Sequence, residues 1–180
     1  PFEMIEDALT PLIIVAADAL SGEEVLLTAG NAVDAVTASA SLPAVYPPAW
    51  VNVSGRDRLL VDGAIVNNIA ITTAINAGAT DIWVLSTGYS CDLTEPPETA
   101  LAAALHAVSL MVQRRFALEM AANTYDVPIH LIPPPCPVLV SPIDFSQSAE
   151  LIERAAENTC TWLDAGEPPA QSVPAVHSAP

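Results

Sequence analysis

Positive charge is scarce in this 180-residue chain: it has no lysine, and its 5 basic residues, all arginine, stand against 21 acidic ones. The formal net charge of -16 excludes nucleic acid as a natural partner, because binding to a phosphate backbone requires positive charge that displaces counterions. The same charge should repel the chain as a whole from anionic membrane surfaces, whereas lipid substrates stay possible because apolar surface holds them.

Cysteine, histidine and glycine are also few. The 3 cysteines, Cys91, Cys136 and Cys160, are widely spaced, which is typical of buried thiols in a reducing, cytoplasmic compartment and not of a disulfide framework or a zinc site. The 3 histidines are isolated, so no pair of them has metal-ligand spacing. With 7 glycines the chain has neither a G-x-G-x-x-G nor a phosphate-binding loop. We therefore expect no metal and no nucleotide or flavin cofactor.

Long hydrophobic runs are missing too. No apolar run reaches the roughly 18 residues that a membrane span needs. The nearest candidate, ALAAALHAVSLMV, contains His106 and is followed by Gln113-Arg114-Arg115. The chain is nevertheless 52% hydrophobic and only 14% charged, which indicates a folded, soluble domain with a sizeable core.

The spacing of the apolar residues predicts strands that alternate with helices. The predicted strands are 11–18, 23–30, 58–62, 81–88 and 127–132, and the predicted helices are 31–41, 69–79, 99–123 and 146–165. The second strand returns after a turn at Ser21-Gly22, Asn31 caps the first helix, and Gly78 ends the second. This order predicts the α/β class, with a layered fold in which helices flank a mostly parallel sheet.

The segment LLVDGAIVNN, residues 59–68, contains the most informative carboxylate, Asp62. Asp-Gly between apolar runs is a signal for a hairpin turn. Alternatively, Asp62 lies at the carboxyl end of a buried strand, where open α/β sheets bind their ligands. A poorly solvated carboxylate there has a raised pKa and acts as a base, and Gly63 lets the backbone approach a partner closely. The residues alone leave both interpretations open.

A nucleophile is harder to find than a base. A serine nucleophile of this fold class is expected in a G-x-S-x-G turn after a strand. The nearest match, GYSCD around Ser90, lacks the second glycine. Ser39 and Ser41 fall in or at the end of a predicted helix, which suits packing and capping. A self-contained set of Ser90, His106 or His130, and Asp62 is the weaker alternative, because Ser90 lacks the turn.

Four segments, in this order, resemble the C-terminal half of bacterial patatin-like phospholipases. They are TPLIIVAADALSGEEV, VTASASLPAVYPP, LLVDGAIVNNIAITTAINAGATDIWVL and VPIHLIPPPCPVLVSPIDFSQSAELIERA. The resemblance covers roughly residues 1 to 165 and implies a patatin-like catalytic domain whose N-terminal half is missing. Residues 166–180, rich in Pro, Ala and Ser, are expected to form a disordered tail.

The resemblance implies a serine acyl hydrolase that uses a Ser–Asp dyad on lipid or other esters, which it could meet at a membrane surface. Its aspartate belongs to a D-G-[GA] pattern, here Asp62-Gly63-Ala64, and its serine is expected upstream of Pro1, so that this chain alone is inactive. Asn67 and Asn68 are expected to brace the Asp62 loop. The alternative is a catalytically inactive interaction or regulatory protein on the same scaffold.

Two positions depart from the family's pattern. Ala70 stands where the family often has a proline, and Tyr46 stands for the aromatic residue of an F-P-P segment. We interpret both as variation in packing that leaves the assignment of Asp62 intact.

Overall fold

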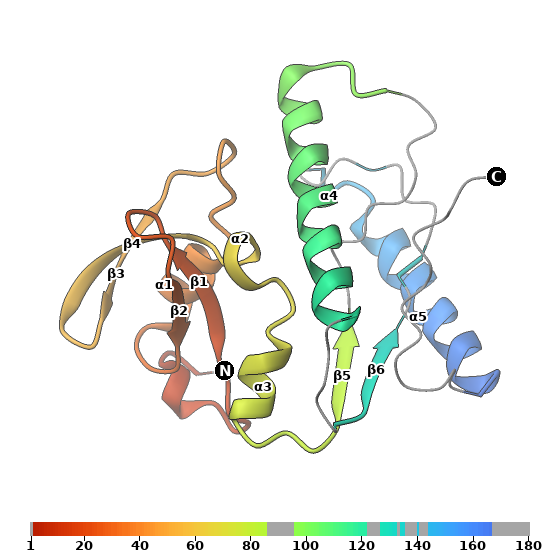
Figure 1. Ribbon diagram of the computed structural model, residues 1–180, viewed down its shortest axis with the longest axis horizontal. Coiled ribbons are helices and arrows are strands. Elements are labelled where there is room, and N and C mark those ends of the chain that lie inside the picture. The colour runs from red at the N-terminus through yellow and green to blue at the C-terminus, as the bar shows by residue number, and fades with distance from the viewer. Residues whose placement is uncertain are drawn as a thin grey trace. The chain divides into compact units, whose positions relative to one another are not determined.

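The computed structural model describes residues 2–85, 96–121, 127–132, 134–135, 140 and 144–166. The chain divides into two compact units, residues 1–70 and 71–180, and each has its own sheet (Figure 1).

The first unit is built on a four-stranded sheet. Its elements are η1 (Ile5–Asp7), β1 (Ile14–Asp18), β2 (Glu24–Leu27), α1 (Ala32–Ser39), β3 (Ala49–Val53), β4 (Arg56–Asp62) and α2 (Ala64–Asn67). The strand order is β2-β1-β4-β3, and every neighbouring pair is antiparallel. The prediction of a mostly parallel sheet is therefore wrong for this unit.

Tight turns account for two of the three antiparallel pairs of this sheet. The chain returns from β1 to β2 through the predicted turn at Ser21-Gly22, and from β3 to β4 through Ser54-Gly55. A parallel pair would need a long crossover instead. No strand is predicted at 49–53, yet Ser54 and Gly55 have φ values of 52° and 83°, as a two-residue hairpin turn requires. The Ser-Gly dipeptide was the available signal for β3.

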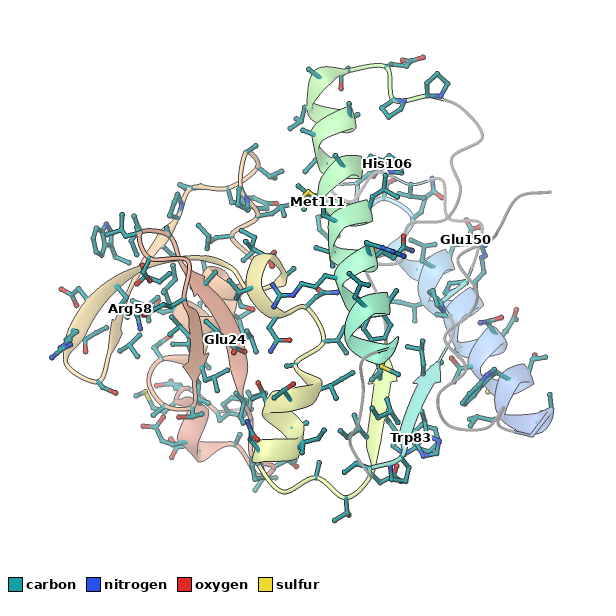
Figure 2. All side chains as sticks on the ribbon, in the orientation of Figure 1. Glu24, Arg58, Trp83, His106, Met111 and Glu150 are labelled. Carbon is teal, nitrogen blue, oxygen red and sulfur yellow. The ribbon has the colours of Figure 1, made fainter. Side chains whose placement is uncertain are left out.

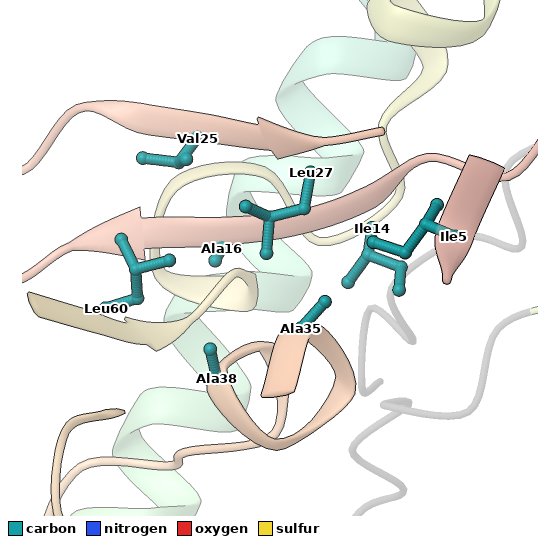
Figure 3. Packing of buried hydrophobic residues seen from close by; sticks show 8 residues of the cluster. All are labelled: Ile5, Ile14, Ala16, Val25, Leu27, Ala35, Ala38 and Leu60. Carbon is teal, nitrogen blue, oxygen red and sulfur yellow. The ribbon is translucent and has the colours of Figure 1, made fainter. Parts of the chain in front are cut away.

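The core of the first unit lies between one face of the sheet and α1. Figure 3 shows buried side chains of the strands pointing toward Ala35 and Ala38 of α1. The cluster comprises Ile5, Ile14, Ala16, Val25, Leu27, Ala35, Ala38 and Leu60. Asn31 is the N-cap of α1, as predicted, because its Oδ1 accepts the N–H groups of Val33 and Asp34 at 2.9 and 3.1 Å. The small alanine side chains let the helix lie close to the sheet.

The second unit pairs two strands and contains three helices among its described residues. Its elements are α3 (Ile71–Asn76), β5 (Ile82–Leu85), α4 (Ala100–Ala121), β6 (Ile129–Ile132) and α5 (Ser148–Asp164). β5 and β6 are parallel, and the segment that connects them contains α4, the kind of crossover that a parallel pair requires. Gly78, with a φ of 93°, follows α3 as predicted.

One expectation about this unit needs correction. We predict a buried strand from the run DIWVLSTG, but Trp83 and Leu85 are 44% and 72% exposed, so β5 is buried on one face only. Among the helices that the structure describes, none is both long and apolar enough to cross a membrane.

Candidate active site

Asp62 is the last residue of β4, and the chain turns directly from this strand into α2. Its backbone N–H donates to the carbonyl oxygen of Ser41, just beyond α1, at 3.0 Å. The hairpin interpretation of Asp62-Gly63 is wrong, because a helix and not a returning strand follows Gly63. Asp62 therefore lies at a strand-to-helix turn.

The two oxygens of the Asp62 carboxylate differ in their surroundings. Oδ1 accepts the N–H of Ala64 at 2.8 Å, whereas Oδ2 accepts no hydrogen bond from any residue in the described part of the chain. Burial raises the pKa of this half-buried carboxylate, and the Ala64 N–H offsets part of that effect. A raised pKa makes the carboxylate a better proton acceptor toward a hydroxyl group. The unbonded Oδ2 is the atom that can accept such a proton.

Gly63 lies against the backbone of β1, at the point where the β1–β4 ladder ends with the Ala16–Asp62 pair. A Cβ at Gly63 would overlap the Val15 carbonyl oxygen and lie 2.7 Å from the carbonyl carbon, so only glycine fits. The hydroxyl of Ser39 in α1 donates to the same carbonyl oxygen at 2.8 Å. The expected close approach at Gly63 is therefore an approach to β1, and it determines where the chain leaves the sheet after Asp62.

The nearby serines have structural hydrogen bonds. Ser39 links α1 to β1 through Val15, and Ser41 donates its hydroxyl to the Thr37 carbonyl at 2.7 Å. The packing and capping roles predicted for the two serines are confirmed.

The two asparagines at the end of α2 differ in what they bind. Asn67 accepts the N–H of Ala70 with Oδ1 at 2.7 Å and donates through Nδ2 to Glu24 Oε1 at 2.8 Å. The side chain of Asn68 makes no hydrogen bond with any described residue. Ala70 has a φ of 52° and supplies an N–H, and proline could provide neither. The departure at Ala70 therefore adds a hydrogen bond and is more than a variation in packing.

All five residues of the predicted site motif line one cavity of about 480 Å³. The full lining consists of Ile13, Ile14, Val15, Val36, Ser39, Ala40, Asp62, Gly63, Ala64, Asn67, Asn68, Ile69 and Ala70. The volume falls in the range of small-molecule sites, and Asp62 is the only charged residue of this lining. A single carboxylate among mostly apolar walls is suited to a substrate with a polar reacting group and a hydrocarbon part.

Sequence reasoning missed two contacts that shape this site. Glu24 lies 43 residues from Asn67, and Val15 lies 24 residues from Ser39. Neither pair has a local sequence signal, because only the strand pairing brings the partners together.

The alternative Ser-His-Asp set gains no support from the described residues. Ser90 lies outside them. His130 Nε2 lies 2.9 Å from Asp81 Oδ1, and its ring stacks on Trp83 with the centroids 4.4 Å apart. His106 is half-buried on α4. The two histidines belong to the second unit, and His130 contacts Asp81 of the same unit.

Cys160 is exposed and free, so the expectation of buried thiols is wrong for this residue. The other two cysteines, Cys91 and Cys136, lie outside the described residues. In the part of the chain that the structure describes, no three His, Cys, Asp or Glu side chains gather in a way that could hold a metal ion.

Comparison with known families identifies one matching segment. The family model described as patatin-like phospholipase matches residues 6–75. This segment contains the whole four-stranded sheet, α1, α2 and every residue that lines the Asp62 cavity. The segment of this chain that carries Asp62 is therefore similar to the patatin-like phospholipases.

Proposed function

We propose that this chain carries the general base of a bacterial patatin-like serine acyl hydrolase that cleaves lipid or other carboxylic esters. Asp62 is the base of a Ser–Asp dyad. The observation that carries the proposal is the state of its carboxylate. It is half-buried with a raised pKa, Ala64 holds one oxygen, the other has no hydrogen bond from a described residue, and Asp62 lines a mostly apolar cavity.

In this proposal the nucleophile is a serine upstream of residue 1, in a segment that completes the site, and residues 1–180 alone are inactive. The serine hydroxyl is a weak nucleophile until a base accepts its proton. Asp62 Oδ2 takes the proton as the serine oxygen attacks the ester carbonyl, which requires an approach to about 3 Å. Backbone N–H groups of an upstream loop stabilise the oxyanion that forms.

The proton then returns in two steps. The protonated Asp62 donates to the departing alcohol, and an acyl-enzyme ester is left on the serine. In the second half of the reaction Asp62 accepts a proton from water, the resulting hydroxide attacks the acyl carbon, and the serine oxygen leaves with that proton. Asp62 ends each cycle ionised, and no net proton is stored in the enzyme.

The apolar walls of the cavity hold the acyl part of the substrate. Ile13, Val36 and Ile69 supply hydrocarbon surface, whereas Gly63 and Ala64 leave room beside the carboxylate. A cytoplasmic enzyme of this kind meets its lipid at a membrane surface. Apolar contact must supply that attraction, since the net charge of -16 opposes binding to anionic lipid.

The test uses the full-length protein and a short p-nitrophenyl ester. Asp62→Asn keeps the size of the side chain and an acceptor for the Ala64 N–H, but it cannot take a proton. We expect kcat to fall by at least about 10³-fold, toward the upper range of a lost general base.

The matched control is Asp57→Asn, the same chemical change on the same strand. Asp57 is exposed and accepts a hydrogen bond from Asn52 at 2.7 Å, which an asparagine oxygen can still accept. This variant should keep wild-type activity. Turnover retained by Asp62→Asn would refute its role as the base. A full-length wild type that hydrolyses no ester would favour the inactive-scaffold alternative.

A further inference from the structure

The Asp62 carboxylate is tied to the start of α2, because its Oδ1 accepts the Ala64 N–H at 2.8 Å; α2 has only four residues, and its N-cap, Gly63, has no capping side chain. Its backbone bonds run from Val66 N and Asn67 N to the Gly63 carbonyl, at 3.1 and 2.8 Å. One turn of helix fixes several dihedral angles for very few hydrogen bonds and is unstable on its own. Contacts made by its side chains must therefore hold α2, and with it the chain that leaves Asp62.

Asn67, the last residue of α2, makes such a contact with the far strand of the sheet. Its Nδ2 donates to Oε1 of Glu24, the first residue of β2, at 2.8 Å. Its Oδ1 is held by the Ala70 N–H at 2.7 Å, so both ends of the amide are engaged. Hydrogen bonds to an ionised carboxylate are roughly twice as strong as neutral ones. Glu24 lies on the first unit's sheet, where Figure 2 labels it.

The strand register shows how this contact reaches Asp62. Glu24 of β2 lies opposite Ala17 of β1, and Ala17 lies opposite Val61 of β4, the residue before Asp62. The bond from Asn67 to Glu24 therefore spans β1. It links the end of α2 to β2, and the strand pairing through Ala17 links β2 back to Val61, the residue before Asp62.

We propose that Glu24 is a positioning residue for Asp62 and acts through Asn67. The inference rests on the proposed function and adds to it a residue that is 38 positions away from the base in sequence and outside the D-G-A-x-x-N-N segment. Proton transfer within a dyad requires the two oxygens at about 3 Å, and a displacement of about 1 Å can cost about 10²-fold in rate. Loss of the Glu24 contact frees α2 and changes the direction of the carboxylate without removing it.

The experiment exchanges the donor and the acceptor of this bond in the full-length protein. Glu24→Ala removes the acceptor, whereas Glu24→Gln keeps an oxygen at the same place. Asn67→Asp sets a second carboxylate against Glu24 and still accepts the Ala70 N–H. Combining Asn67→Asp with Glu24→Gln restores a hydrogen bond in the opposite direction, from the glutamine amide to the new carboxylate.

For a short p-nitrophenyl ester we expect Glu24→Ala to lower kcat about tenfold with KM within about twofold of wild type, the pattern of a lost transition-state interaction. Glu24→Gln should stay within about twofold of wild-type kcat, because its oxygen still accepts the bond. Asn67→Asp should lower kcat about 10²-fold, and adding Glu24→Gln should recover about tenfold of that loss.

Glu23→Ala is the matched control, because it removes an equally acidic, exposed neighbour whose carboxylate faces Arg58 at 3.2 Å and not Asn67. Its kcat should equal that of wild type. A residue with a merely structural role would lower the melting temperature in Glu24→Ala without a selective loss of kcat and without recovery in the double variant. Wild-type kcat in Glu24→Ala, or no recovery in the double variant, would overturn the proposal. Failure of the proposed function itself would give different results: either Asp62→Asn would still hydrolyse the ester, or the wild-type protein would not hydrolyse it at all.

Discussion

Two strands of the first unit end in an aspartate on the same face of the sheet, and their surroundings differ sharply. β1 ends at Asp18 after the apolar run IIVAA, and β4 ends at Asp62 after LLV. Asp18 lies opposite Leu60, and Asp62 lies opposite Ala16, only two rows away. Burial by itself would raise the pKa of both carboxyl groups.

Asp18 is surrounded by donors. Its Oδ1 accepts the N–H groups of Ser21 and Leu20 at 3.0 and 2.9 Å, and its Oδ2 accepts Arg58 Nε at 2.8 Å. The Ser21 N–H, then the Arg58 guanidinium, then the Leu20 N–H lower the pKa of Asp18 to about 2. A carboxylate with its bonds filled in this way is a weak base, and its role is to hold the β1–β2 turn to β4.

Asp62 has one such donor, Ala64, and faces a cavity in place of a cation. Its pKa is raised, mainly because burial disfavours the ionised form. The number of hydrogen-bond donors around a strand-end aspartate therefore decides whether its pKa is lowered, as at Asp18, or raised, as at Asp62. The chain has only 5 basic residues, and one of them neutralises Asp18.

The two strand-end aspartates are each followed by a turn that contains a glycine, Gly22 after Asp18 and Gly63 after Asp62. We expect alanine at these two glycines to change stability by very different amounts. Gly63→Ala would overlap the Val15 carbonyl, so we expect the free energy of unfolding to fall by about 3 kcal/mol, the upper range for overpacking. Gly22→Ala has no atom within 4 Å of the new Cβ and should cost only about 1 kcal/mol for its φ of 74°. Urea denaturation of both variants measures the difference. Equal costs would show that the approach of Gly63 to β1 does not constrain the site.

The next prediction concerns the pKa of Asp18, which we expect to become more like that of Asp62 when its cationic partner is removed. Arg58→Met keeps an apolar stem and removes the cation, so the pKa of Asp18 should rise from about 2 toward its ordinary value, held partly down by Ser21 and Leu20. The pKa of Asp62 should not change, because Arg58 is not among its neighbours. A carboxyl NMR titration reads both groups in one sample.

The same variant has a defined pH dependence of stability. The folded pKa of Asp18 lies below the unfolded value of about 3.8, so the stabilisation is fully present above about pH 4 and is lost as the pH falls through about 2. Arg58→Met should therefore be less stable than wild type at pH 7 and close to it near pH 2. A difference that grows on acidification would contradict this account.

The smallest expected effect has the opposite sign. Because the folded pKa of Asp62 is raised, its ionisation opposes folding as the pH rises through the unfolded value of about 3.8. Asp62→Asn should stabilise the protein at pH 7, and the gain should vanish below the unfolded pKa, near pH 3. Urea denaturation at the two pH values measures it. A loss of stability at pH 7 would mean that the ionised carboxylate holds the turn together.

Local features of this fold could be predicted from the sequence because they depend on neighbours along the chain. Asn31 caps the helix that follows it, Ser21-Gly22 turns β1 into β2, and the apolar run before Asp62 forms a strand. The antiparallel sheet could not be predicted in the same way. Alternation of strands and helices indicates parallel pairing. The short strand β3, which shows that β4 belongs to an antiparallel hairpin, follows the prolines at 43, 47 and 48 and was not recognised from the sequence.

Hydrophobic spacing and local backbone geometry are enough to predict β1, β2, β4 and α1 and to place Asp62 at the end of a strand with a glycine after it, but not β3 or α2. Which of the two strand-end aspartates has a raised pKa depends instead on how the strands pair and what then surrounds each carboxylate. Hydrogen-bond donors and burial set that pKa: Arg58, 40 residues away in sequence, reaches Asp18 only because the strands pair, whereas burial dominates at Asp62.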